Sequence, residues 1–211
     1  VFLDDDAFVK PFYLSNLKKQ LDRHPEADAF GGKIVPLFET GKEPEWLCKW
    51  NYSWVSAIDK GDEVIPFEGN SYPIGANMGV RKSCFEEVGA FNTELGRSKK
   101  NLMAGEEKDL FNRMKALGKA ILYFPDIEVE HVIPERRTTE EYIIKMAQGT
   151  GMSEKLRCQS AGKGALLRRR LAELVKWAGT LVLWMGYTLK GQSAKGRMLV
   201  VFRKNVTKGL F

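Results

Sequence analysis

A short apolar run at the start of the chain, Val1-Phe2-Leu3, is followed directly by Asp4-Asp5-Asp6. This pattern predicts a buried strand that delivers its acids to the C-terminal edge of a sheet. In open α/β folds that edge is where ligands bind. Carboxylates are hard oxygen ligands that suit Mg²⁺ or Mn²⁺. An acidic helix cap is the alternative, but a cap accounts for one acid and not for three adjacent ones.

The length and composition are those of one domain with an appendage. The 211 residues are 44% hydrophobic and 28% charged, which is typical of a globular protein with a sizeable core. Cys48, Cys84 and Cys158 are odd in number and widely spaced, so they fit neither a disulfide framework nor a zinc site. We therefore expect a reducing compartment.

Charge is unevenly distributed along the chain. Residues 151–211 hold 13 Lys and Arg against two acids, Glu154 and Glu173, a net of +11, whereas residues 1–150 hold 20 bases against 25 acids, a net of −5. The partner of the basic tail should be anionic, either membrane lipid or nucleic acid. A basic helix that is merely solvated is the alternative.

Strand and helix signals alternate along the acidic part, which predicts an α/β fold with a mostly parallel or mixed sheet. Four helices are expected. The first covers residues 11–23, with Phe12, Leu14, Leu17 and Leu21 as its apolar face, and the third covers residues 105–117. The second is short, opened by a capping box at Ser83 and ended by Gly89, and the fourth is opened by a capping box at Thr138 and runs to about residue 156. The expected strands are 29–35, in which Gly31-Gly32 marks a close backbone approach and Pro36 is the stop, then 74–80, 120–124 before Pro125, and 127–131.

Residues 38–72 show weak periodicity and are expected to form a long insertion or loop. Trp46, Trp50 and Trp54 are spaced as one stripe of a helix within it. We favour packing of this stripe onto the body, and an aromatic platform for an acceptor is the alternative.

Four segments follow one another in a specific order: VFLDDD, PIGANMGVRKSCFEEVGAF, GEEKDLFNRM and YFPDIEVEHV. In this order and spacing the chain resembles the family-2 glycosyltransferases of the GT-A fold, from Val1 to about Met152. That family has a strand ending in DxD, a GxN segment, a short helix ending in VGGF, a GED helix and a strand ending in His. The resemblance implies a GT-A-like (Rossmann-like) mixed sheet flanked by helices.

The resemblance also implies roles for individual residues. Asp4 and Asp6 match the two Asp of DxD, so Asp6 would bind the metal and Asp4 would contact the donor. His131 matches the His that completes the metal site in several members, although a structural histidine at a strand end is the alternative. Gly75, Ala76 and Asn77 would line the floor beneath the transferred sugar.

Glu106-Glu107 matches the family's acidic pair, so Glu107 is the first candidate for the catalytic base and Glu106 the second. The family has Asp where this chain has Glu107, and acids in a first helical turn also complement the helix dipole without any catalytic role. Asp109 lies close in sequence as well. Arg137 or its neighbour Arg136 would lie near the diphosphate.

The implied reaction is inverting transfer of a sugar from a nucleotide-diphosphate sugar to a hydroxyl of a glycan or lipid-linked acceptor. Mn²⁺ or Mg²⁺ would stabilise the leaving diphosphate, and a carboxylate on the opposite face would deprotonate the acceptor. The family's N-terminal nucleotide-binding half has no counterpart in these residues. We therefore expect residues 1–152 to be a partial catalytic domain, inactive alone, that belongs to a longer protein.

Residues 153–211 are expected to form a basic amphipathic helical tail. Arg168-Arg169-Arg170 precedes 13 uncharged residues, 177–189, a run too short to span a bilayer. A basic cluster beside an apolar helix suits the membrane interface, and docking of this helix on the body is the alternative. We expect a cytoplasmic, peripheral location at the membrane.

Two other functions compete with the glycosyltransferase. A metal-dependent nucleotidyltransferase also uses paired Asp at a strand end, and it would release pyrophosphate rather than a nucleoside diphosphate. A binding module for nucleic acid or membrane without catalysis would rest on the basic tail. The tail lacks a nucleic-acid motif, so no nucleic-acid partner is expected.

Overall fold

The computed structural model describes residues 1–95, 105–160 and 162–211, and the chain divides into two compact units. The first unit comprises Val1–Gly41, Tyr52–Thr93 and Glu106–Pro134, and the second includes Lys42–Asn51 and Glu135–Phe211. The expected division after residue 152 falls inside a helix of the second unit. The tail therefore shares its unit with segments that precede residue 152.

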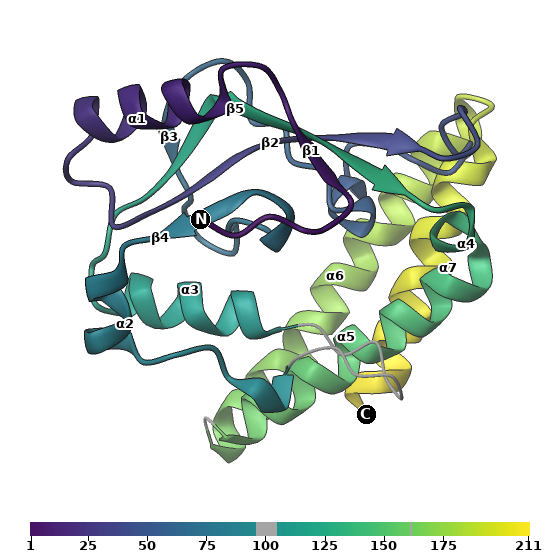
Figure 1. The fold of residues 1–211 in the computed structure, drawn as a ribbon. Helices are drawn as coiled ribbons and strands as arrows, with labels where there is room; N and C mark the ends of the chain where they lie inside the picture. Colours follow the sequence, from purple (N-terminus) through teal and green to yellow (C-terminus); the bar gives the residue numbers. More distant parts are fainter. Residues whose placement is uncertain (96–104, 161) are drawn as a thin grey trace. The chain divides into compact units, whose positions relative to one another are not determined.

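The first unit is built on a five-stranded mixed sheet (Figure 1), in agreement with the expected α/β class. Its strand order is β1-β5-β2-β4, with β3 also paired to β5. β2 and β5 are parallel, and the other pairings are antiparallel. The strands are β1 (Ala7–Val9), β2 (Ala29–Phe38), β3 (Ile65–Pro66), β4 (Met78–Val80) and β5 (Ile121–Ile133).

The prediction of a buried strand at Val1-Phe2-Leu3 is wrong, because all three side chains are exposed. Phe2 makes one antiparallel bridge: its backbone N–H donates to the Met78 carbonyl at 2.7 Å, and its carbonyl accepts from Met78 N–H at 3.2 Å. Across the described ranges, no strand pairs with Phe2 on its other side. This single bridge still holds the segment just before Asp4-Asp5-Asp6 next to β4.

Neither proline ends its strand, contrary to expectation. β2 continues through Pro36, which lies beyond the pairings of β2 with β4 and with Ile58, where a missing N–H donor costs little. Pro125 lies in an irregularity of β5, because the register jumps from Gly32 opposite Phe124 to Lys33 opposite Glu128. The two predicted strands 120–124 and 127–131 are therefore one long bulged strand.

Helices of the first unit cover the sheet on both faces. They are α1 (Tyr13–Arg23), α2 (Lys82–Val88) and α3 (Glu106–Ala116). One buried cluster joins residues of α2 and α3 to Ile121 and Tyr123 of β5, and a second joins residues of α1 to Phe124 and Val129. Because neighbouring strand residues point to opposite faces, β5 contributes to both clusters.

The helix expected at 105–117 is confirmed, and two details of the other helices are corrected. In α1 the buried residues include Tyr13 and Leu17, whereas Phe12 and Leu14 are exposed, so the apolar face is rotated from the predicted one. In α2 the helix already begins at Lys82, so Ser83 lies inside it and does not cap it. Gly89 ends α2 as predicted, with a φ of 80°.

The tryptophan stripe does not form a helix. Residues 44–51 form turns, fixed by the buried Asn51 side chain, which accepts from Cys48 N–H at 2.7 Å and donates to the Trp46 carbonyl at 3.1 Å. A short 3₁₀ turn, η1 (Tyr52–Val55), follows. Trp46 and Trp54 are buried and Trp50 is exposed. Two of the three tryptophans therefore pack inside their units, but the helix that their spacing indicated is wrong.

The second unit is helical, with α4 (Glu135–Thr138), α5 (Glu140–Ser160), α6 (Lys163–Leu189) and α7 (Ser193–Leu210). α5, α6 and α7 pack against one another (Figure 1). The hydroxyl of Thr139, not Thr138, accepts from Tyr142 N–H at 3.3 Å, which places the helix start one residue later than predicted. Among the described helices, none combines the length and apolar character needed to cross a bilayer.

Candidate functional site

The pairing of β1 with β5 brings Asp6 to His131. Ala7 lies opposite His131 in the antiparallel register, and Asp6 directly precedes Ala7. The backbone carbonyl of Asp6 accepts from Val132 N–H at 2.9 Å, and that of Asp4 accepts from Ala7 N–H at 3.1 Å. The turn that carries both acids is thus fixed to the C-terminal end of β5, a long strand inside the sheet.

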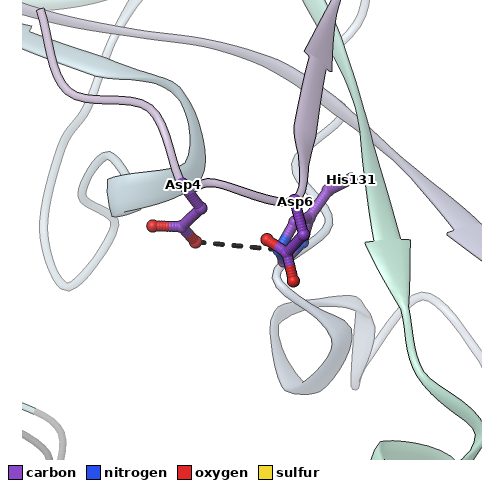
Figure 2. Close-up of side chains that lie close together, drawn as sticks. All are labelled: Asp4, Asp6 and His131. Carbon is purple, nitrogen blue, oxygen red and sulfur yellow. Dashed lines mark hydrogen bonds and ion pairs between the residues drawn. The ribbon is translucent and has the colours of Figure 1, made fainter.

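Asp4, Asp6 and His131 form a compact cluster (Figure 2). His131 Nε2 lies 2.9 Å from Asp6 Oδ1 and 3.6 Å from Asp4 Oδ2. One potential ligand atom from each residue lies within 4.8 Å of the others. His131 is fully buried, while the side chains of Asp4 and Asp6 are 48% and 36% exposed. The imidazole therefore lies at the buried end of the cluster, and the two carboxylates lie at its solvent-exposed side.

This donor set fits a divalent cation. Carboxylate oxygens suit Mg²⁺ and Mn²⁺, and imidazole nitrogen adds a ligand that transition metals accept. Three protein ligands leave coordination positions open for a substrate, as is usual for cations that bridge to phosphates. The fit rests on the chemistry and spacing of the side chains.

A third carboxylate, from α3, lies near Asp4. Glu107, in the first turn of α3, accepts a hydrogen bond at Oε1 from Gly75 N–H at 2.8 Å. A Cβ added to Gly75 would lie 2.6 Å from Glu107 Oε1 and 3.6 Å from Asp4 Oδ1. The carboxylates of Glu107 and Asp4 therefore both lie beside Gly75, and Glu107 in its present position leaves no room for a Cβ there.

The other acids of α3 differ from Glu107. Asp109 pairs with Arg113 Nε at 2.9 Å, and the guanidinium of Arg113 also donates to the carbonyls at the end of α2, including Ala90 O at 2.8 Å. Asp109 thus has a structural role between two helices. Glu106 is half-buried in the same turn, but the hydrogen bond to Gly75 belongs to Glu107.

Ala76 and Asn77 are fully buried beneath this segment. Asn77 Nδ2 donates to the carbonyls of Ile127 at 2.7 Å and Lys33 at 3.1 Å, and Oδ1 accepts from Tyr13 at 2.7 Å. A Cβ on Gly32 would lie 2.2 Å from Asn77 Nδ2, which confirms the predicted close approach at the glycine pair. The Asn77 side chain therefore positions η2 (Gly75–Asn77) over the sheet.

Arg136 and Arg137 lie in α4 of the second unit. Arg137 is buried and Arg136 is exposed. The structure thus brings together Asp4, Asp6, His131, Gly75 and Glu107 within the first unit, while the two arginines belong to the other unit.

Comparison with known proteins adds an independent observation. No protein-family model matches the chain. Over 156 residues, it is 27% identical to a glucosyl-dolichyl phosphate glucuronosyltransferase of Haloferax volcanii, covering 73% of this chain and 49% of that protein. The chain is a distant homologue of a glycosyltransferase. It spans about half the length of this relative.

This homology supports the enzyme class that the motifs predicted, glycosyltransferase. The name of the relative describes transfer of a glucuronosyl group to a glucose linked to dolichyl phosphate, a lipid-linked saccharide. The individual roles of Asp4, Asp6, His131 and Glu107 stay predictions from sequence and geometry.

Sequence reasoning missed Tyr13 as a residue that supports the site. Its hydroxyl holds Asn77, and burial raises its pKa to about 12. A usable signal was the spacing of Tyr13, Leu17 and Leu21, which defines the inward face of α1 more accurately than a face that begins at Phe12.

Proposed function

We propose that this chain is the catalytic part of an inverting, metal-dependent glycosyltransferase of the GT-A fold. It would move a sugar from a nucleotide-diphosphate sugar to a hydroxyl of a glycan or lipid-linked acceptor. Support comes from the distant homology to a glycosyltransferase and from the mixed sheet. The observation that carries the proposal is the cluster of Asp4, Asp6 and His131, together with Glu107, which lies with Asp4 beside Gly75.

In this proposal Asp6 and His131 hold a Mn²⁺ or Mg²⁺ ion, and Asp4, the more exposed acid, binds the ribose or sugar of the donor. The bound cation supplies Lewis-acid stabilisation of the charge that develops on the leaving diphosphate. Asp6 is well placed for this role because its backbone is hydrogen bonded to β5 and its carboxylate meets a buried histidine.

Glu107 acts as the general base that accepts the proton of the acceptor hydroxyl. The Gly75 N–H fixes one carboxylate oxygen, which reduces the freedom of a long side chain. Attack from the face opposite the leaving diphosphate then inverts the anomeric carbon. Gly75 supplies this N–H, and its lack of a side chain leaves room for the Glu107 carboxylate.

The acceptor is proposed from the relative. Its name specifies a dolichyl-phosphate-linked glucose, so a saccharide on an isoprenoid phosphate is the first acceptor class to test for this chain. The donor class follows from the metal cluster, since a divalent cation bridges to phosphates more readily than to neutral sugars.

The test is donor turnover by the protein at its full natural length, with a panel of UDP-, GDP- and dTDP-sugars. We expect nucleoside diphosphate to be released in the presence of Mn²⁺, and Glu107→Gln to lower the rate about 100-fold or more with Mn²⁺ binding unchanged. Glu106→Gln, one position away in the same turn, is the comparison for charge. Release of pyrophosphate would instead favour a nucleotidyltransferase. Full activity in Glu107→Gln would show that Glu107 is not the general base.

A further inference from the structure

One face of α6 is apolar and exposed along nearly the whole helix. Seven large apolar side chains on this helix are 50–89% exposed, although α6 packs against two other helices. Their positions recur at i, i+4, i+7, i+8, i+15, i+18 and i+22, which is one side of an α-helix. We call this surface the α6 face: Leu167, Leu171, Leu174, Val175, Val182, Met185 and Leu189.

The opposite side of α6 is the one that packs inside the second unit. Glu173 and Thr180 are buried there, and Trp177 Nε1 donates to the hydroxyl of Thr207 in α7 at 2.9 Å. The α6 face spans about 33 Å at 1.5 Å per residue. A surface of this length and composition marks an interaction site in proteins.

The charge around the α6 face has a single sign. Together α6 and α7 contain ten Lys and Arg and one acid, Glu173. Glu173 does not offset charge at the surface, because its side chain is 2% exposed and pairs with Arg169 at 2.6 Å and Arg203 at 3.1 Å. Arg168 and Lys190, toward the two ends of the face, are exposed.

We propose that the α6 face docks onto an anionic lipid bilayer, with α6 lying in the plane of the interface. Apolar side chains enter the boundary between headgroups and acyl chains, and flanking cations contact lipid phosphates. A nucleic acid would complement the charge but would leave the apolar side chains in water. This inference rests on the second unit alone and would stand if the proposed transferase activity failed.

The experiment is cosedimentation of the whole chain with vesicles, without any sugar donor. We expect binding to vesicles of phosphatidylcholine mixed with phosphatidylglycerol, and much weaker binding to phosphatidylcholine alone. Leu174→Glu should lower the partition coefficient about tenfold, since it removes a leucine that would enter the bilayer and adds a negative charge that the anionic lipids repel. Leu14→Glu changes a similarly exposed leucine in α1 of the first unit and should have no effect.

A second pair of variants tests the electrostatic part. Arg168→Gln should weaken binding to the anionic vesicles about fivefold, as expected for one basic residue at an anionic surface. Arg23→Gln, an exposed arginine of α1, is the matched control and should leave binding unchanged.

The orientation of α6 is tested by a fluorophore at a single site. All three native cysteines are buried, so Val182→Cys introduces an exposed thiol that can be labelled selectively. An environment-sensitive dye at residue 182 should shift to the blue on anionic vesicles, whereas the same dye on Leu14→Cys should not. Equal spectra at the two sites would contradict insertion of the α6 face.

Two outcomes would overturn the proposal. The first is a stable dimer in solution that Leu174→Glu dissociates, with no vesicle binding by the wild type. The second is salt-sensitive binding to a DNA or RNA duplex together with no difference between anionic and neutral vesicles.

Discussion

The backbone N–H of Gly75 donates a hydrogen bond to Glu107 Oε1 at 2.8 Å, although the two residues are 32 positions apart. The bond joins η2, which Asn77 fixes to the sheet, to the first turn of α3. This hydrogen bond therefore sets the position of Glu107, the proposed base, relative to Asp4, which also lies beside Gly75.

Gly75→Ala should impair catalysis without weakening the fold. The added Cβ would meet Glu107 Oε1 at 2.6 Å, and the end of a flexible side chain can move aside at little cost. The displaced carboxylate would be misplaced by about 1 Å, which typically lowers a rate about 100-fold. Steady-state kinetics and thermal unfolding of the same protein check this, and a variant with wild-type kcat would contradict the proposed role of Glu107.

Gly32→Ala should have the opposite effect, loss of stability. The Cβ would meet the backbone oxygen of Ile127 at 2.1 Å and Asn77 Nδ2 at 2.2 Å, and neither atom can move without distorting the sheet. We expect the free energy of unfolding to fall by about 1–3 kcal/mol or more, as for an overpacked core. Urea unfolding measures it, with Gly75→Ala as the paired control. Equal stability in the two variants would contradict a tight packing of Ile127 and Asn77 against Gly32.

Glu173→Gln should destabilise the second unit at neutral pH by about 3 kcal/mol, as expected when a buried ion pair loses one partner. Burial alone would raise the pKa of Glu173, but Arg169 and Arg203 outweigh burial and hold it below its ordinary value. The stabilisation by the charged Glu173 is therefore present above pH 4.5 and is lost as the pH falls through the lowered pKa. Unfolding measured at pH 7 and at pH 3 should show a larger difference in stability between wild type and variant at pH 7 than at pH 3. A pH-independent difference would contradict the account.

Tyr13→Phe should lower stability by about 1–3 kcal/mol near pH 8, because the buried Asn77 Oδ1 loses its donor. It should also reduce the sensitivity of the fold to alkali. Burial raises the pKa of Tyr13 to about 12 from its ordinary value of 10, so its contribution is complete below pH 10 and is lost as the pH rises through 12.

Unfolding free energies measured between pH 8 and pH 11.5 check the tyrosine prediction. Tyr123→Phe is a useful comparison, since burial raises the pKa of Tyr123 to about 12 as well. Wild-type stability should fall more steeply with pH than that of either variant. Identical slopes in wild type and Tyr13→Phe would contradict it.

Local patterns in the sequence predicted most of the first unit. The helix that begins at Glu106, the glycine approach at Gly32 and the alternation of strands with helices follow from periodicity and glycine placement, which act over a few residues. The errors came from tertiary context. Pro36 and Pro125 usually end strands, but an edge position and a bulge accommodate them, and neither is visible without the pairing partners.

The sequence indicated which residues belong to the candidate site, but not the hydrogen bonds that hold them in place. Asp4, Asp6, His131 and Glu107 stood out as acids and a histidine in motif positions, and the structure brings them into one unit. The Gly75–Glu107 hydrogen bond and the support of Asn77 by Tyr13 join residues that are far apart in sequence, so no spacing rule could indicate them. The tryptophan spacing misled because the Asn51 side chain stabilises turns in place of a helix.

The most direct test of the account is the effect of Asp6→Asn on Mn²⁺ binding and on metal-dependent release of nucleoside diphosphate, measured on the protein at its full natural length. The account predicts that the wild type releases nucleoside diphosphate from one donor of the panel only with Mn²⁺ or Mg²⁺. Asp6→Asn should lose both the release and most of the Mn²⁺ affinity, while keeping the wild-type unfolding temperature within a few degrees. Unchanged Mn²⁺ binding in Asp6→Asn, with no release from any donor by the wild type, would contradict the proposed metal site and the proposed reaction.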